Sequence, residues 1–255
     1  MNDAATGAEI VRFSHVSKQY PGTLANDDVS LSIRRGEVFA LVGENGAGKS
    51  TLMNLLYGLQ APTLGDIYIK GEKTGPQHGP ENAMRMGVSM VHQHFKLVPS
   101  FTVAQNVMLG HEPRRGLFYD RREAEETVRR LSAEYGLKVE PGDVVRDLSV
   151  GIQQRVEILK ALRTGADVLI LDEPTRGIDI GAKAEIQQVV LDLASQGMGV
   201  VFISSELEEV VRLSDDIEVL KDRHKIAEIE NDDTVSQATI VETIANTNVN
   251  TGKEA

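Results

Sequence analysis

The sequence contains no cysteine in its 255 residues. This absence excludes disulfide bonds, thiolate metal sites and thiol nucleophiles, and it is typical of a cytosolic protein. No uncharged apolar stretch approaches the roughly 20 residues that a membrane-spanning helix needs, and the N-terminus lacks the basic flank and apolar segment of a signal peptide. We therefore expect a soluble protein, with any membrane role acting through a partner.

Basic residues are scarce relative to acidic ones. The chain has 27 lysine and arginine residues against 38 aspartate and glutamate residues, which gives a formal net charge of −11. This balance argues against a general basic surface for nucleic acid or anionic lipid. Any site for a phosphate-bearing ligand must therefore be local.

One such local site is the glycine-rich segment 43–50, which has the pattern G-x-x-x-x-G-K-S/T. It lies between the apolar run 38–42 and a helix-like segment that begins at Thr51. In this context of strand, loop and helix, consecutive backbone N–H groups can wrap a phosphate chain. Lys49 would reach the outer phosphates, and the Ser50 hydroxyl would hold a magnesium ion. The alternative is a glycine-rich turn that only opens an ordinary helix.

A second motif pairs two carboxylates with a buried strand. The unbroken apolar run 168–171 is typical of a central parallel strand covered on both faces, and Asp172 and Glu173 follow it directly. Asp172 would complete the magnesium site with Ser50, and Glu173 would polarise an attacking water. Two acids after an apolar strand are common by themselves. Together with the upstream segment 43–50, a P-loop, they are a specific signal for a nucleotide and magnesium site.

Three further places in the chain carry candidate site residues. Gln93 follows a short apolar strand and is a candidate site residue at the strand end. Tyr20, beside a Pro-Gly turn, either stacks on a nucleobase or packs locally. Ser149 and Gly151 open the helix expected over 150–162, where they form either a simple helix cap or a second phosphate-binding device.

The order of the expected elements predicts an α/β fold with a P-loop NTPase core. Short strands over 10–42 favour an antiparallel β-subdomain, and the helical pattern between about 98 and 165 indicates an inserted helical subdomain. Apolar strands continue the core at 168–171 and 200–203, and an amphipathic helix is expected over 184–196. Residues 246–255 form a polar tail.

With the P-loop, Gln93, the segment 148–151 (Leu-Ser-Val-Gly) and the segment 171–173 (Leu-Asp-Glu) in this order, the chain resembles the ATP-binding subunits of ABC transporters. The resemblance covers about residues 9–245 as a single nucleotide-binding domain. It implies ATP and Mg²⁺ as cofactors, with Glu173, Lys49 and Gln93 in catalysis and Ser50, Gln93 and Asp172 around the metal. The implied nucleotide contacts are Tyr20 as the aromatic residue on adenine, Gly43, Glu44, Asn45, Gly46, Ala47, Gly48, Lys49, Ser50 and Thr51 of the P-loop, and Ser149 and Gly151 of the signature, while Asp179 is similar to the D-loop aspartate.

The resemblance also implies partners. In this family two ATP-binding subunits, identical or different, sandwich two ATP molecules, each between the P-loop of one subunit and the signature of the other. The pair would act on transmembrane permease subunits at the cytoplasmic face of the membrane, with a solute-binding protein as an indirect partner and no nucleic acid. Soluble ABC-type ATPases of translation or DNA repair are a weaker alternative, because they usually have paired cassettes or long coiled coils.

Finer similarity differs between the two halves of the chain. The segments 25–31 and 91–95 resemble the first cassette of tandem ATPases for nucleoside or simple-sugar uptake. The segments 173–179 and 203–207 resemble the second cassette of sugar-import ATPases. Because the sequence has one P-loop, our hypothesis is a single cassette that joins the two types.

Ser205 departs from the family pattern. It occupies the place of the switch histidine, which in the family contacts the γ-phosphate. We expect Ser205 to form a capping box with Glu208, with a direct phosphate contact as the alternative. Because that histidine is replaced, an alternative function is a degenerate regulatory subunit that binds nucleotide with little turnover.

Overall fold

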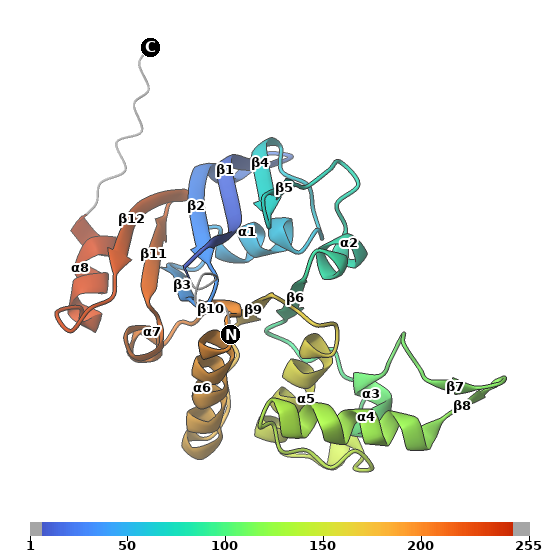
Figure 1. Cartoon of the computed structure of the whole chain (residues 1–255). Coiled ribbons are helices and arrows are strands. Elements are labelled where there is room, and N and C mark those ends of the chain that lie inside the picture. The colour runs from blue at the N-terminus through green and yellow to red at the C-terminus, as the bar shows by residue number, and fades with distance from the viewer. Residues whose placement is uncertain (1–6, 247–255) are drawn as a thin grey trace.

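The structure is a computed structural model that describes residues 7–246 (Figure 1). The predicted polar tail lies outside the described residues except for Asn246, which ends the last helix. Among residues 7–246, no helix combines the length and apolar character needed to cross a bilayer. This part of the chain contains a six-stranded sheet, a four-stranded sheet and a two-stranded hairpin, together with helices, some of which form a separate group.

The larger sheet has six strands in the order β12-β11-β3-β10-β9-β6. All are parallel except β12, which pairs antiparallel with β11 at one edge. Because the parallel strands share one direction, their carboxyl ends meet at the same edge of the sheet, where ligands bind in such folds. The strands are β3 (Val38–Gly43), β6 (Val88–Val91), β9 (Val168–Asp172), β10 (Gly199–Ile203), β11 (Asp216–Lys221) and β12 (His224–Glu230).

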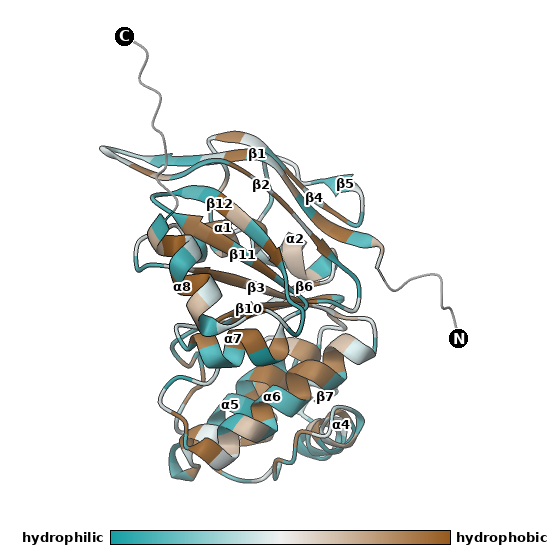
Figure 2. Ribbon diagram, turned by 90° about the vertical axis from the view of Figure 1, so that its left-hand side faces the viewer, coloured by the Kyte–Doolittle hydropathy of each residue, from teal (hydrophilic) through white to brown (hydrophobic). Residues whose placement is uncertain are grey.

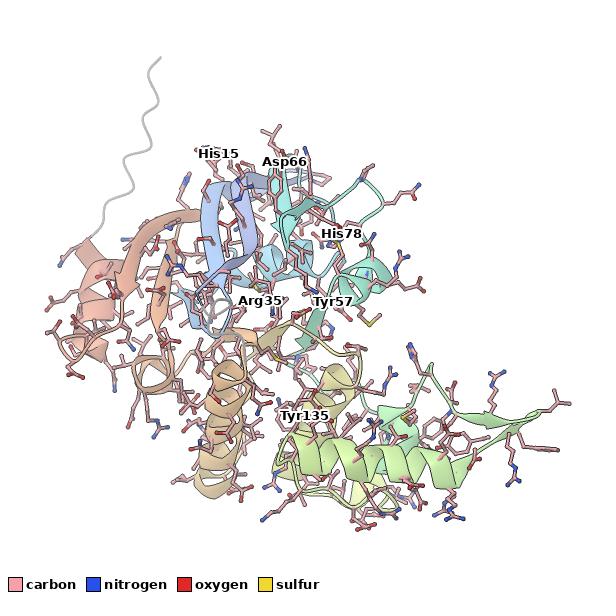
Figure 3. The ribbon with its side chains drawn as sticks, viewed as in Figure 1. His15, Arg35, Tyr57, Asp66, His78 and Tyr135 are labelled. Atoms are coloured by element: carbon pink, nitrogen blue, oxygen red, sulfur yellow. The ribbon has the colours of Figure 1, made fainter. Side chains whose placement is uncertain are left out.

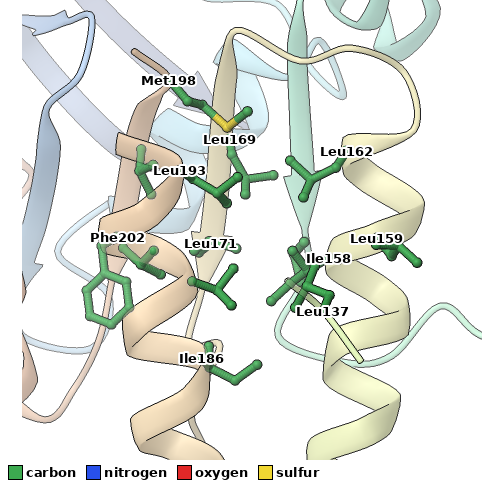
Figure 4. Packing of buried hydrophobic residues seen from close by; sticks show 14 of the residues in the cluster. Leu137, Ile158, Leu159, Leu162, Leu169, Leu171, Ile186, Leu193, Met198 and Phe202 are labelled. Atoms are coloured by element: carbon green, nitrogen blue, oxygen red, sulfur yellow. The ribbon is translucent and has the colours of Figure 1, made fainter. Parts of the chain in front are cut away.

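Alternate residues of the central strands enter two different hydrophobic clusters. On β9, Val168 and Ile170 pack into one cluster, whereas Leu169 and Leu171 pack into the other. Figure 4 shows the second cluster, in which side chains of β9 meet those of two helices. Strands β3 and β10 are also largely apolar in Figure 2, because both faces of these strands are covered. The predicted α/β fold is confirmed.

The smaller sheet is antiparallel, as predicted for the N-terminal region. Its strand order is β2-β1-β4-β5, and it shares a hydrophobic cluster with β3 and helix α1 (Lys49–Leu56). In Figure 1 this sheet lies above α1. Its strands are β1 (Glu9–Tyr20), β2 (Thr23–Arg34), β4 (Leu64–Ile69) and β5 (Glu72–Lys73).

Helices between β6 and β9 gather at the lower right of Figure 1, away from the smaller sheet. The helix expected over 150–162 has those bounds, and Thr102 caps its own helix with a complete capping box. A short hairpin, β7 (Arg114–Arg115) with β8 (Phe118–Tyr119), projects from this group, and Leu117 at its tip is 96% exposed. The helices are α3 (Val103–Val107), α4 (Arg121–Glu134), the 3₁₀ helix η1 (Val145–Asp147) and α5 (Val150–Leu162).

Helix α6 begins four residues earlier than predicted. It spans Ile180–Ser195, because Asp179 occupies the N-cap position and its carboxylate accepts a hydrogen bond from the Ala182 N–H at 3.0 Å. The apolar stripe alone predicts a start near residue 184, because the buried residues of this helix begin only at Ile186. The other helices are α2 (Pro80–Arg85), α7 (Leu207–Leu213) and α8 (Gln237–Asn246).

Candidate nucleotide-binding site

A hollow of about 340 Å³ lies at the carboxyl edge of the larger sheet. The P-loop forms one wall, and the residues that follow β6 and β9 form another. Residues 23–25, at the start of β2, close a third side. The sheet therefore brings together side chains that are far apart in the sequence.

The glycines of the P-loop are required by its backbone. Gly43 has φ +145°, and a Cβ there would lie 2.1 Å from the carbonyl oxygen of Leu220. Gly48 has φ +105°, and its Cβ would lie 2.2 Å from Asn26 Nδ2. Gly48 is also the N-cap of α1, and no side chain caps this helix. The first N–H groups of α1 are therefore available to an anion, and the helix dipole favours negative charge there.

The Lys49 ammonium lies inside the loop. Its Nζ donates to the carbonyl oxygens of Gly43 at 2.6 Å and Glu44 at 3.0 Å. Burial lowers the pKa of Lys49, while the nearby charges of Glu173 and Asp172 act in the opposite direction. An ammonium with three donors keeps one for a phosphate oxygen in this position.

Asp172 ends β9 and is buried beside Ser50. Burial is the main cause that raises the pKa of Asp172 and the charge of Glu173 adds to it, whereas Lys49 and a hydrogen bond with Ser50 lower it. A cation at this point would offset the cost of burying the carboxylate.

The donor set at Asp172 fits Mg²⁺. In residues 7–246, no three His, Cys, Asp or Glu side chains come close enough to form a metal cage. Magnesium, however, is usually bound through one or two carboxylates together with phosphate and water oxygens. Ser50, Asp172 and Gln93 line the same hollow and supply a hydroxyl, a carboxylate and an amide oxygen.

Glu173 has an unusual backbone conformation. Its φ is +52°, in the left-handed region that non-glycine residues rarely occupy. Its N–H donates to the carbonyl oxygen of Ile203 at 2.9 Å, and its Oε2 accepts a hydrogen bond from Ser205 Oγ at 3.0 Å. The carboxylate lines the hollow beside Lys49.

The predicted capping box of Ser205 with Glu208 is wrong. The N-cap of α7 is Glu206, whose N–H donates to Ser204 Oγ at 3.0 Å. Because β10 and β9 are neighbours and end together at the pair Ile203 and Asp172, Ser205 lies close to Glu173 and donates its hydroxyl to that carboxylate instead. A contact between Ser205 and a phosphate remains a prediction.

Tyr20 is not among the residues that line the hollow. Its hydroxyl donates to Gln60 Oε1, and the Lys18 ammonium lies 5.1 Å from the centre of its ring. The neighbouring residues 23–25 reach the hollow. Stacking of Tyr20 on adenine therefore stays a prediction.

Ser149 and Gly151 also lie away from the hollow, at the start of α5. Ser149 is exposed and its hydroxyl makes no capping hydrogen bond, although it occupies the N-cap position. Gly151 is buried, and a Cβ there would lie 2.6 Å from the Cβ of Ala182 on α6. The glycine thus has a packing role, and any contact of either residue with a nucleotide stays a prediction.

Two arginines that belong to none of the predicted site motifs also line the hollow. Arg176 follows the carboxylate pair, and Arg223 lies in the turn between β11 and β12 with φ +78°. The Arg223 carbonyl accepts a hydrogen bond from the Asp27 N–H at 2.9 Å, which fixes the turn against β2. The sequence around Arg223 does not mark it as a site residue, since turns of charged residues are common. Arg223 reaches the hollow because β11 pairs with β3, the strand that leads into the P-loop.

The sheet order, the P-loop on β3 and the carboxylates at the end of β9 define a P-loop nucleotide-binding protein. The chain belongs to the ABC transporter family, whose model matches residues 26–176. The resemblance noted in the sequence is thereby confirmed.

Three curated relatives are similar over most of this chain. The fructose import ATP-binding protein FruK of Bifidobacterium longum is 55% identical over 89% of this chain and 45% of its own length. The nucleoside import ATP-binding protein NupA of Lactococcus lactis subsp. cremoris is 42% identical, with the same coverage of 89% and 45%. The ribose import ATP-binding protein RbsA 3 of Rubrobacter xylanophilus is 47% identical over 86% and 44%. The chain therefore spans about half the length of the curated relatives it matches.

Solved structures agree with the fold. A nucleotide-free ATP-binding cassette from an ABC transporter superposes with a TM-score of 0.78 at 26% identity, covering 94% of each chain. A dimeric ATP-binding cassette in a post-hydrolysis state, bound to ADP and Pi, gives a TM-score of 0.75 at 27% identity and covers 88% of this chain and 99% of its own.

Proposed function

We propose that the chain is the ATP-binding and ATP-hydrolysing subunit of an ABC importer for a simple sugar or a nucleoside. The observation that carries this proposal is the meeting of Lys49, Ser50, Asp172 and Glu173 in one hollow. The import functions in the names of FruK, NupA and RbsA 3 support the solute class.

Each of these groups has a distinct part in the proposed reaction. The N–H groups of the P-loop bind the phosphates, and Lys49 stabilises the negative charge that spreads over the transferred group. Ser50, Asp172 and Gln93 would hold Mg²⁺, which when bound neutralises phosphate charge. Glu173 accepts a hydrogen bond from the attacking water, and so orients it or takes its proton.

The site is proposed to be completed by a second ATP-binding subunit, in a homodimer or a heterodimer. Ser149 and Gly151 lie away from the hollow of their own chain, so a partner's copies would have to reach the nucleotide. The exposed hydroxyl of Ser149, free of any capping hydrogen bond, is suited to that contact. The dimer of the similar cassette bound to ADP and Pi supports this arrangement.

Permease subunits are the proposed membrane partners, and they would hold the chain at the cytoplasmic face of the membrane. A second hollow of about 240 Å³ lies beside Gln93, where β6 meets α5. It includes His92 and Tyr57, whose rings meet edge-on with centroids 6.0 Å apart (Tyr57 is labelled in Figure 3). A permease segment bound there would sense the position of Gln93. A solute-binding protein would act only through the permease, and the net charge gives no support for nucleic acid.

A Glu173→Gln variant tests the reaction. The amide cannot accept the proton of the water, so we expect ATP turnover to fall at least 100-fold while ATP affinity stays within about threefold of the parent. Phosphate release and binding of a fluorescent ATP analogue measure the two quantities. As a control, Lys49→Ala should weaken ATP binding itself.

The second candidate function, a degenerate regulatory subunit, is favoured by Ser205 at the place of the family's histidine. It predicts tight ATP binding with equal phosphate release from the parent chain and from Glu173→Gln. That outcome would contradict the ATP-hydrolysing subunit and support the regulatory subunit.

A further inference from the structure

Glu209 on α7 joins the segments that follow two neighbouring strands. Only 3% of this residue is exposed, and its Oε2 accepts hydrogen bonds from Thr175 Oγ1 at 2.5 Å and Ser204 Oγ at 3.2 Å. Thr175 stands two residues after Glu173, and Ser204 directly precedes Ser205. One carboxylate oxygen therefore binds both segments that form the hydrogen bond between Ser205 and Glu173.

The second oxygen of Glu209 is also occupied. Oε1 accepts from Gln187 Nε2 at 3.0 Å and lies 3.6 Å from Lys183 Nζ, both on α6. Gln187 in turn accepts a hydrogen bond from Arg212 through its own Oε1. A buried carboxylate with partners on both oxygens is a fixed point, because moving it would leave several donors unsatisfied.

We propose that Glu209 is a positioning residue for Glu173. By fixing Thr175 and Ser204, it holds Glu173 and Ser205 within hydrogen-bond distance and maintains the left-handed backbone of Glu173, a conformation that persists only where the surroundings impose it. This inference rests on the proposed function, because it assigns Glu209 to the carboxylate that orients the water. Glu209 itself is not among the residues that line the hollow.

A Glu209→Gln variant changes the cluster with almost no change of volume. If the new amide oxygen faces Thr175 and Ser204, its NH₂ group faces the NH₂ group of Gln187, and the reverse orientation turns the NH₂ group toward the two hydroxyls. One side of the cluster is lost in either case. We expect kcat to fall about 10- to 100-fold, since small displacements of a catalytic group have effects of this size.

ATP affinity separates positioning from general damage. Because the P-loop is not part of the cluster, the Kd for ATP should stay within about twofold of the parent, and the KM should change little. Circular dichroism and thermal unfolding with ATP check that the variant remains folded. An equal loss of kcat and ATP affinity would overturn the proposal, since it would mean that Glu209 supports the whole fold.

A charge exchange provides the rescue. In Glu209→Gln/Gln187→Glu, the amide at 209 can accept from Thr175 and Ser204 and donate to the carboxylate at 187, which still accepts from Arg212. We expect kcat to recover to within about threefold of the parent, while Gln187→Glu alone places two carboxylates together and stays impaired. Recovery supports the positioning role. No recovery in a double variant that folds as stably as the parent would overturn it.

The parent and Glu173→Gln chains are measured in the same assay. A parent rate no higher than that of Glu173→Gln would mean that the proposed function fails. A parent rate that depends on Glu173, together with an unchanged kcat in Glu209→Gln, would overturn the role of Glu209 alone.

Discussion

Glu218 lies on β11 with 1% of its surface exposed, 3.0 Å from Lys225 Nζ on β12. Burial is the main cause that raises the pKa of Glu218 from 4.5 to about 8, although Lys225 acts in the opposite direction. The folded chain therefore keeps a proton on Glu218 that the unfolded chain releases above about pH 4.5. Stability should fall as the pH rises through this window and level off above about pH 8.

A Glu218→Gln variant should flatten this dependence. Its amide carries no charge at any pH, so the loss of unfolding free energy between pH 5 and pH 8 should be smaller than in the parent by up to roughly 3.5 kcal/mol. Urea unfolding at both pH values measures the difference. Some slope remains, because burial also raises the pKa of Glu37 to about 8.

The exposed Glu228, which also pairs with Lys225, gives the control. The hydrogen bond from Lys225 lowers the pKa of Glu228, so Glu228 itself does not titrate between pH 5 and pH 8. Its charge adds to the raised pKa of Glu218, so Glu228→Gln should reduce the loss in this window far less than Glu218→Gln does. Equal curves for the parent and Glu218→Gln would contradict the assignment.

Among individual residues, the sequence identifies the site residues that belong to a local motif. Lys49 and Ser50 stand in one motif, and Asp172 and Glu173 end one apolar strand, so no knowledge of the sheet is needed to single them out. The hydrogen bond from Ser205 to Glu173 spans 32 positions and depends on which strands are neighbours. Local pattern instead favoured a helix cap, which competes for the same kind of residue.

Helices α5 and α6 come into close contact at Gly151 and Ala182. In Gly151→Ala the two Cβ atoms would lie 2.6 Å apart, so we expect a loss of roughly 1 to 3 kcal/mol in unfolding free energy. Gly151→Ala/Ala182→Gly removes the clash and should recover most of that loss, because the cost of about 0.5 to 1 kcal/mol for a glycine in α6 is offset by the alanine gained in α5. Urea unfolding measures both variants.

The same pair separates packing from chemistry at the signature segment. If Gly151 also approaches a partner's nucleotide, the double variant should be stable yet still slow in ATP hydrolysis. Full activity in the double variant would limit Gly151 to helix packing.

Helix bounds were predictable where caps and stripes agree. The helix over 150–162 was placed correctly because Ser149 and the apolar stripe mark the same start. The start of α6 was missed, since its first turn is exposed and only Asp179 marks it. The resemblance had assigned Asp179 another role, but the same side chain also caps the helix.

The P-loop and Ser149 lie apart in one chain. If both bind the same nucleotide, two chains must form a dimer when ATP is bound. Glu173→Gln with ATP should sediment at about twice the mass of one chain. Adding Ser149→Arg should weaken this dimer at least 10-fold, because a long charged side chain would replace a small hydroxyl at the proposed interface. ATP binding to the single chain should be unchanged.

Analytical ultracentrifugation with and without ATP measures the assembly. The exposure of Ser149 and its lack of a capping bond mean that the substitution should not unfold α5. A variant that dimerises as well as its parent would place the interface elsewhere.

The β7–β8 hairpin gives this molecule a practical advantage for spectroscopy. Leu117 is 96% exposed at the tip, and the chain has no native thiol. A Leu117→Cys change would create a single attachment point for a dye or spin label, without the need to remove other reactive side chains. The mobility of the hairpin could then be followed in solution with and without ATP.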